Sequence, residues 1–305
     1  PSFTFFATAG SVARLGGVPV WVDVDPHHFN IDLADAARKV SPRTRAIMPV
    51  HLFGQSCDLV ALQAFASAHR IRIVEDAAQS MGARWQGRST MSVGDLGTTS
   101  FFPSKNLGGM GDSGLVTTSD DALADRARIF RVHGMQPKYY HREVGANFRM
   151  DPLQAALLHL KLPHLPEYNC ARAGNANFYH AALKGQVGIA ENRPGAEATA
   201  KILLPVDFSG QGIWNQFTLR VTGGRRDALK AFLTARKIGC EIYYPIPLHR
   251  QECFASAGYR GGDSVPVSEL LSTEVLSIPI FPELSVEQRQ WVADSLADFA
   301  AGKNE

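Results

Sequence analysis

Three short runs rich in β-branched residues constrain the fold of this chain more than any other feature of its sequence. They cover residues 18–24, 45–50 and 71–75, lie about 25 residues apart, and each has the length of a buried strand. Between the second and third runs, residues 58–70 carry apolar side chains at helical spacing behind an aspartate that can cap a helix. The order strand, helix, strand predicts parallel strands and an α/β fold.

Polar residues directly follow the three predicted strands. Asp25, His51 and Asp76 therefore lie at the carboxyl ends of the strands, where open parallel sheets bind ligands. A buried Asp76 carboxylate needs a cationic partner, which a protonated pyridine ring can supply, but capping of a following helix explains Asp76 equally well. Gln79 could hydrogen-bond a phenolic oxygen on the same ring, although a lone glutamine is more often a surface residue.

Lys105 lies between the aromatic and proline residues at 101–103 and a glycine-rich run that ends at Gly114. Such surroundings desolvate an amine, which lowers its pKa and makes it a nucleophile that can form a Schiff base. A solvated lysine in a turn is the commoner case for a lysine chosen at random. The lysine alone therefore decides nothing.

Ser100 ends a predicted strand five residues before Lys105. Together with Asn106 and the glycines it could offer hydroxyl and backbone N–H donors to a phosphate group. Asp76, Ser100 and Lys105 then supply a clamp for a pyridine ring, a phosphate anchor and a Schiff-base lysine. These are the groups that pyridoxal 5'-phosphate requires.

The remainder of the chain predicts the rest of a large domain and a smaller α+β domain. The glycine, alanine, proline and glutamate residues of segment 184–200 mark the boundary, so we expect a large domain at residues 1–185 and a small one at 186–305. The large domain is predicted to include a strand at 113–118, helices at 120–131, 151–162 and 167–183, and an irregular functional segment at 133–149. The small domain is predicted to contain strands at 216–221 and 240–244 and helices at 226–237 and 286–299.

Composition excludes several classes of protein. The chain is 45% hydrophobic and 20% charged, and no stretch has the apolar length of a membrane span. The formal net charge of +2 comes without a basic block, which argues against nucleic-acid binding. The four cysteines have no CxxC pair and no histidine at metal-ligand spacing, so we expect no metal site and reduced thiols in a cytoplasmic protein.

Five separated segments resemble the DegT/DnrJ-type sugar aminotransferases, which have the aspartate aminotransferase fold. The segments are EDAAQS at 75–80, SFFPSKNLGGMGDSG at 100–114, HLFGQ at 51–55, NFRMDPLQAALL at 147–158 and YYPIPLH at 243–249. They occur in the family's order and span nearly the whole chain. The resemblance implies a pyridoxal-phosphate enzyme of fold type I, with a mostly parallel sheet in the large domain and a small C-terminal α+β domain.

The resemblance also implies roles for individual residues. Lys105 would bind the cofactor as a Schiff base and move the proton, Asp76 would pair with the ring nitrogen, and Gln79 would contact the ring or its 3-oxygen. Ser100 would bind the phosphate within its own chain, and Asn147 would reach the phosphate of the neighbouring chain. Phe5 would stack on the ring, and Tyr244 and His249 would face the substrate. A homodimer with its active site at the interface is therefore expected. A phenylalanine in the core is the alternative explanation of Phe5.

The implied activity is amination of a keto group on a nucleotide-linked sugar, with glutamate as the expected nitrogen donor, in polysaccharide or amino-sugar biosynthesis. Sugar dehydration is an alternative, although dehydrating relatives have histidine in place of Lys105. Amination of a cyclitol or an aromatic precursor is a second alternative. Family members begin with a helix and a Gly-Thr turn ahead of the position of Pro1, so we expect a fragment, or an impaired enzyme that holds its cofactor weakly. A dimeric binding or regulatory protein is the third alternative.

Overall fold

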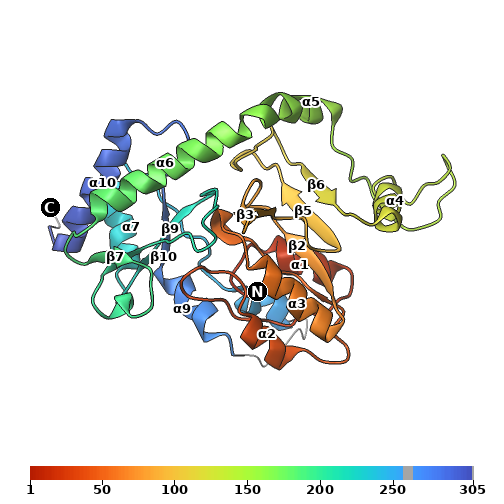
Figure 1. Ribbon diagram of the computed structural model, residues 1–305, viewed down its shortest axis with the longest axis horizontal. Coiled ribbons are helices and arrows are strands. Elements are labelled where there is room, and N and C mark those ends of the chain that lie inside the picture. The colour runs from red at the N-terminus through yellow and green to blue at the C-terminus, as the bar shows by residue number, and fades with distance from the viewer. Residues whose placement is uncertain (257–263, 304–305) are drawn as a thin grey trace.

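Two four-stranded sheets organise the chain in the computed structural model, which describes residues 1–256 and 264–303 (Figure 1). The first sheet has the order β1-β2-β5-β6, in which β1, β2 and β5 are parallel and β6 is antiparallel. Its strands are β1 (Ala46–Ile47), β2 (Arg72–Asp76), β5 (Leu96–Ser100) and β6 (Gly114–Thr117). The parallel strands confirm the predicted α/β fold.

Helix α3 (Leu59–His69) forms where the sequence predicts a helix between two strands. One carboxylate oxygen of Asp58 accepts hydrogen bonds from the N–H groups of Val60 and Ala61, both at 2.9 Å, and so caps the helix. Leu62 packs with Ile47 of β1 and Ile73 of β2 in one buried cluster. This packing holds the carboxyl ends of β1 and β2 side by side.

The prediction of a strand at residues 18–24 is wrong. Within the described residues this segment forms one isolated antiparallel bridge, between Val24 and Ile31. Pro19 has no backbone N–H to donate to a neighbouring strand, and the side chain of Val18 is exposed. The run is therefore an unpaired segment that is buried towards its end, and its β-branched residues do not form a paired strand.

The second sheet has the order β10-β9-β8-β7. Its strands are β7 (Ile189–Glu191), β8 (Ile202–Leu204), β9 (Phe217–Val221) and β10 (Val275–Ile278). Helices α6 (Leu165–Leu183), α7 (Arg226–Ala235) and α10 (Val286–Ala301) contribute to the same buried core as these strands. The predicted strand at 216–221 is confirmed, whereas the one predicted at 240–244 is wrong, because Glu241 forms only an isolated bridge with Ser277 within the described residues.

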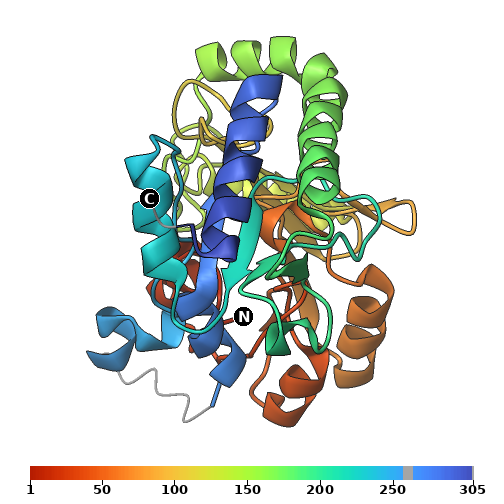
Figure 2. The same cartoon turned by 90° about the vertical axis from the view of Figure 1, so that its left-hand side faces the viewer.

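Helix α6 connects the two sheets, and Figures 1 and 2 show it running from α5 to the side of α10. Near its start, Leu165 packs with Phe101 and Leu107, on either side of Lys105. Further along, Tyr179 lies in the core of the second sheet. One helix therefore contacts both the lysine loop and the second core, and the division between domains at residues 185 and 186 stays a prediction.

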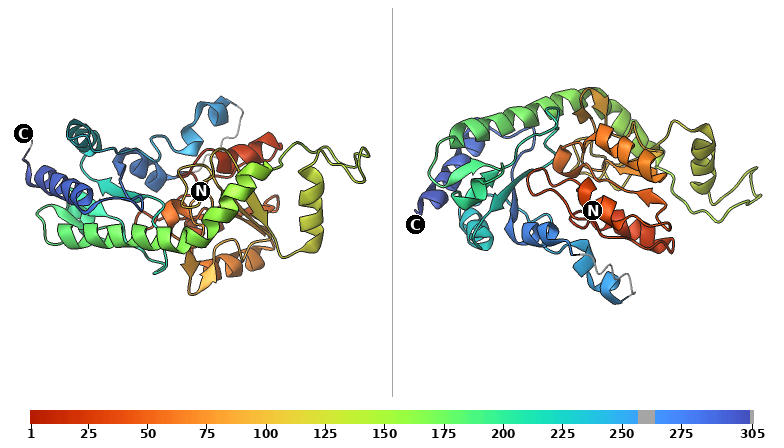
Figure 3. Two further views of the ribbon diagram at one scale, coloured as in Figure 1. Left: turned by 90° about the horizontal axis from the view of Figure 1, so that it is seen from above. Right: turned by 60° about the horizontal axis from the view of Figure 1, so that its bottom comes forward.

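The segment after α4 (Asp121–Phe130) extends away from the rest of the chain before α5 (Pro152–Lys161) begins (Figure 3). Large side chains on it are exposed, including Tyr139 at 76% and Val144 at 99%. Such exposure is typical of an interaction surface rather than of a simple connector.

The remaining elements are short. They are α1 (Ala7–Arg14), α2 (Leu33–Lys39), β3 (Arg84–Trp85), β4 (Arg88–Ser89), α8 (Glu252–Ser256), α9 (Pro266–Glu274) and the 3₁₀ turns Leu52–Gly54, Leu162–His164, Ala196–Ala198 and Leu248–Arg250. No helix among residues 1–256 and 264–303 is long and apolar enough to cross a membrane.

Candidate active site

Asp76 is the last residue of β2, and both oxygens of its carboxylate accept a hydrogen bond. The hydroxyl of Thr8 donates to Oδ2 at 2.7 Å, and the backbone N–H of Ala78 donates to Oδ1 at 3.1 Å. The bond to Ala78 is a capping contact, but the residues that follow form a turn and not the helix that the sequence allowed, and the bond to Thr8 orients the other oxygen. A carboxylate oxygen has two lone pairs, so each oxygen keeps one for a cationic ligand.

Lys105 lies in the loop after β5, where its backbone N–H donates to the Phe102 carbonyl at 2.9 Å. Burial lowers the pKa of the Lys105 amine, and the negative charge of Asp76 opposes this shift. The structure therefore brings Lys105 and Asp76 within electrostatic reach of each other. A lysine with a lowered pKa has more of its amine in the neutral, nucleophilic form at a given pH.

Gln79, Tyr244 and Phe5 come together from three distant parts of the chain. The buried Gln79 accepts the N–H of Phe53 at 2.7 Å and donates through Nε2 to the Tyr244 hydroxyl at 3.1 Å. Burial raises the pKa of Tyr244, so its hydroxyl stays protonated. The ring of Phe5 lies 6.1 Å from that of Tyr244 between centroids and is 58% exposed. An aromatic ring with this exposure is not a core residue and has a surface available for stacking.

Ser100 ends β5, and its Oγ accepts the N–H of Phe102 at 3.2 Å. The hydroxyl proton of Ser100 is still available for an anion. Asn106 differs, because its side-chain Nδ2 donates to Asn169 Oδ1 at 2.6 Å and to the Ile213 carbonyl at 2.9 Å. An amide nitrogen has two protons, so the Asn106 side chain has no further donor for phosphate.

Two further residues singled out from the sequence, Asn147 and His249, form hydrogen bonds with other protein groups. Asn147 is exposed on the projecting segment, where its Oδ1 accepts from the backbone N–H and the Nε of Arg149 at 3.3 and 3.0 Å. His249 shares hydrogen bonds with the Ser2 hydroxyl at 2.7 Å and Glu269 at 3.0 Å. Their predicted roles, phosphate binding across chains and substrate binding, stay predictions.

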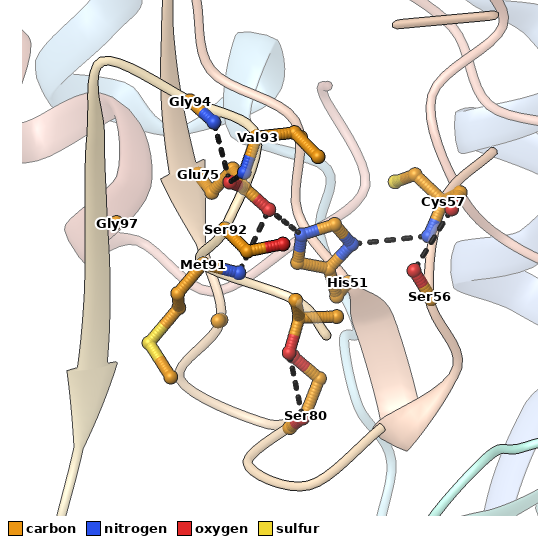
Figure 4. Close-up of polar contacts among 12 residues, drawn as sticks. His51, Ser56, Cys57, Glu75, Ser80, Met91, Ser92, Val93, Gly94 and Gly97 are labelled. Atoms are coloured by element: carbon orange, nitrogen blue, oxygen red, sulfur yellow. Dashed lines mark hydrogen bonds and ion pairs between the residues drawn. The ribbon is translucent and has the colours of Figure 1, made fainter. Parts of the chain in front are cut away.

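A fully buried pair joins His51 to Glu75, the residue before Asp76, and the sequence does not predict it (Figure 4). The two side chains meet at 2.9 Å between His51 Nε2 and Glu75 Oε2. The Glu75 carboxylate also accepts the N–H groups of Met91, Val93 and Gly94 at 2.9, 2.9 and 2.7 Å. Four donors therefore surround one buried carboxylate.

The proton on His51 can be placed from its hydrogen bonds. The N–H of Cys57 donates to Nδ1 at 3.0 Å, so Nε2 carries the ring proton and donates to Glu75. A second ring proton on Nδ1 would displace the N–H of Cys57 from this nitrogen, and we therefore assign the neutral ring.

Glu75 keeps its charge in this environment and thereby holds the end of β2. Burial opposes the charge, but the hydrogen bonds from His51, Gly94 and Val93 outweigh it and lower the pKa of Glu75. The backbone N–H of His51 donates to the Asp76 carbonyl at 3.0 Å. Successive strand residues point to opposite faces, so anchoring Glu75 on one face fixes the direction of Asp76 on the other.

The groups present fit pyridoxal phosphate. Lys105 has a desolvated amine, Asp76 has a carboxylate held by two donors, and Ser100 has a spare hydroxyl proton. Phe5 adds an exposed aromatic face. Among residues 1–256 and 264–303, no group of three or more histidine, cysteine, aspartate or glutamate residues could hold a metal ion.

Comparison with known proteins identifies relatives over nearly the whole chain. The model of the DegT/DnrJ/EryC1/StrS aminotransferase family matches residues 1–297. A pleiotropic regulatory protein from Geobacillus stearothermophilus is 44% identical, over 98% of this chain and 77% of the relative. A UDP-N-acetyl-3-dehydro-alpha-D-glucosamine 3-aminotransferase from Acidithiobacillus ferrooxidans is 41% identical, over 94% of this chain and 73% of the relative.

A solved structure of similar fold supports the relationship found from the sequence. Streptomyces venezuelae DesV, crystallised in complex with a ketimine intermediate, superposes with a TM-score of 0.89 at 38% sequence identity. The superposition covers 98% of this chain and 77% of that chain. The described chain therefore has the same fold as this solved structure.

Proposed function

The chain belongs to the DegT/DnrJ/EryC1/StrS aminotransferase family, and from this premise we propose that it aminates a keto group on a nucleotide-linked sugar. It is a transaminase, and its cofactor is pyridoxal 5'-phosphate. The observation that carries the proposal is the pairing of Lys105, whose pKa is lowered by burial, with the oriented carboxylate of Asp76.

The cofactor supplies an aldehyde that condenses with amines and a ring that takes up electrons from the bond being broken. Lys105 would bind it covalently and, once released, carry a proton on Nζ between the cofactor carbon and the substrate carbon. Asp76 would keep the ring nitrogen protonated, with Thr8 and Ala78 holding the carboxylate in place. Ser100 would donate to the phosphate, and Phe5 would stack on the ring.

The substrate assignment rests on the relatives. Several are named as aminotransferases of UDP- or dTDP-linked sugars, including a UDP-2-acetamido-2-deoxy-3-oxo-D-glucuronate aminotransferase at 37% identity. Tyr244 and His249 are the residues that we propose for the substrate side. Glutamate as nitrogen donor, a role in polysaccharide or amino-sugar biosynthesis and a cytoplasmic location belong to the same proposal.

We also propose a homodimer whose interface includes the projecting segment after α4. Exposed side chains on this segment, such as Tyr139 and Val144, would be covered by the second chain. Asn147 lies on the same segment, and this placement supports the prediction that it reaches the phosphate in the neighbouring chain.

A regulatory protein is the second candidate function, because the 44% identical relative carries the name pleiotropic regulatory protein. Cofactor chemistry separates the two candidates. The purified protein should turn yellow with pyridoxal phosphate, and borohydride should bleach it and leave a label on Lys105 that mass spectrometry can locate. A colourless protein without the label would overturn the aminotransferase proposal and favour the regulatory candidate.

Turnover provides the second test of this proposal. Glutamate and a panel of nucleotide-linked keto sugars should give an amino sugar detectable by mass spectrometry. Lys105→Ala should lower the rate by at least about 10³-fold, because it removes both the covalent attachment and the proton carrier. A Lys105→Ala protein that still aminates the sugar would show that another group is the nucleophile. Dehydrated products in place of amines would favour the dehydratase alternative.

A further inference from the structure

One side chain links the loop that carries Lys105 to the segment that carries Asp76 and Gln79, and it belongs to neither of them. That side chain is Asn169, near the start of α6 (Leu165–Leu183). Its Oδ1 accepts a hydrogen bond of 2.6 Å from Nδ2 of Asn106, the residue next to Lys105. Its own Nδ2 donates to the Met81 carbonyl at 3.3 Å.

The approach of the second segment to Asn169 is close. Gly82, directly after Met81, has a positive φ of +99°, and a Cβ at this position would come within 2.7 Å of Asn169 Nδ2. Glycine is therefore needed both for the backbone conformation and for the contact. Met81 follows Gln79 by two residues, so this contact holds the end of the Asp76 segment.

The Asn106 side chain also links the loop of Lys105 to Ile213. It is 7% exposed, and besides Asn169 it donates to the Ile213 carbonyl at 2.9 Å. The N–H of Ile213 in turn donates to the Gly54 carbonyl, also at 2.9 Å. Four segments distant in sequence therefore meet at the two amide side chains.

We propose that Asn169 is a positioning residue that sets the location of Lys105 relative to Asp76 and Gln79. An asparagine suits this place because its side chain accepts from Asn106 and donates to Met81 at the same time. Aspartate could only accept, and alanine could do neither. The inference rests on the proposed function, in which Lys105 binds the cofactor covalently.

The test measures covalent attachment of pyridoxal phosphate to Lys105, as the fraction trapped by borohydride and located by mass spectrometry, together with the absorbance of the bound cofactor. Asn169→Ala should raise the pyridoxal phosphate concentration for half-maximal attachment roughly tenfold, because two hydrogen bonds at the junction are lost. Asn106→Ala should behave similarly. Asn169→Asp keeps the acceptor for Asn106 and loses the donor to Met81, so its effect should be smaller.

Asn175→Ala is the matched control from the same helix. Asn175 is 2% exposed, and its amide donates to the Phe281 carbonyl at 2.9 Å, away from Lys105 and Asp76. This variant should lose stability in thermal unfolding but keep normal attachment to Lys105. If Asn169→Ala does not fold, Asn169→Asp provides the comparison with Asn175→Ala.

The outcomes separate this inference from the proposed function. If the unchanged protein attaches the cofactor and Asn169→Ala or Asn169→Asp attaches it equally well, the positioning role alone is overturned. An equal effect of Asn175→Ala also overturns it, since the effect would then be general destabilisation. Absence of attachment in the unchanged protein overturns the proposed function, and the positioning role with it.

Discussion

At the scale of single residues, the contact between Thr8 and Asp76 has the most direct chemical consequence. The Thr8 hydroxyl donates to one carboxylate oxygen of Asp76 at 2.7 Å. No sequence motif predicts this hydrogen bond, because the two residues are 68 positions apart. A hydrogen bond to a charged group is worth more than one between neutral groups. Thr8 therefore holds one oxygen of the carboxylate that would pair with the ring nitrogen.

Thr8→Val should weaken cofactor binding by about tenfold, because valine keeps the shape of threonine and removes the donor. Thr8→Ser should bind nearly as well as the unchanged protein. A titration with pyridoxal phosphate followed by absorbance measures the effect. Thr99→Val is the control: the buried Thr99 hydroxyl donates to the Ala77 carbonyl at 3.1 Å and does not touch the carboxylate. Equal losses in the two valine variants would contradict the role given to Thr8.

The residues predicted from the sequence were those with a local signal. Asp76 follows a buried strand and Lys105 is enclosed by aromatic and glycine residues, so short segments indicate both as candidates, and their combination indicates a cofactor site. Thr8 and Asn169 could not be, because their roles depend on partners that only the folded chain brings near. Long-range side-chain contacts have no periodicity or spacing along the sequence from which to predict them.

At the scale of elements, burial and strand pairing have to be distinguished. Residues 71–75 and 18–24 have similar composition, but the first run pairs with two neighbours as β2 (Arg72–Asp76), whereas the second forms an isolated bridge in the described residues. The composition of a segment indicates only that it is extended and at least partly buried. Which backbone groups find partners depends on the rest of the fold.

The end of β2 depends on Glu75, and this gives stability a predictable pH dependence. The pKa of Glu75 is lowered in the folded protein, because the hydrogen bonds from His51 and two backbone N–H groups outweigh its burial. A lowered carboxyl pKa contributes stability above the unfolded value of 4.5, and this contribution is lost as the pH falls through the folded value. The free energy of unfolding should therefore drop over this acidic range.

Glu75→Gln should remove that part of the pH dependence. It should also lower the free energy of unfolding near neutral pH by about 2–4 kcal/mol, because the side-chain NH2 group of glutamine is a donor and would face backbone N–H groups that need an acceptor. Urea unfolding at a series of pH values measures both effects. Glu197→Gln, at an exposed glutamate, should leave both unchanged. A Glu75→Gln protein with an unaltered acid profile would show that other carboxylates control it.

At the scale of the whole molecule, the role proposed for Asn147 implies that one chain does not complete its own site. This residue lies on the segment that extends from the body after α4, and the described chain holds its side chain only through Arg149. We predict that Asn147→Ala weakens activity by acting on the partner's site. Mixing inactive variants tests this directly, because an isologous dimer exchanges equivalent segments between its two sites.

When Lys105→Ala and Asn147→Ala proteins are unfolded and refolded together, about half of the dimers should be mixed. In a mixed dimer, the chain that keeps Lys105 receives an intact Asn147 from its partner, so one of two sites works. Activity should then recover to roughly a quarter of that of the unchanged protein. If Asn147 served its own chain, each site in the mixed dimer would carry a defect, and the mixture would show only the summed activities of the separate proteins. Lys105→Ala mixed with Asp76→Asn is the control, because both residues act within one chain and no recovery is expected.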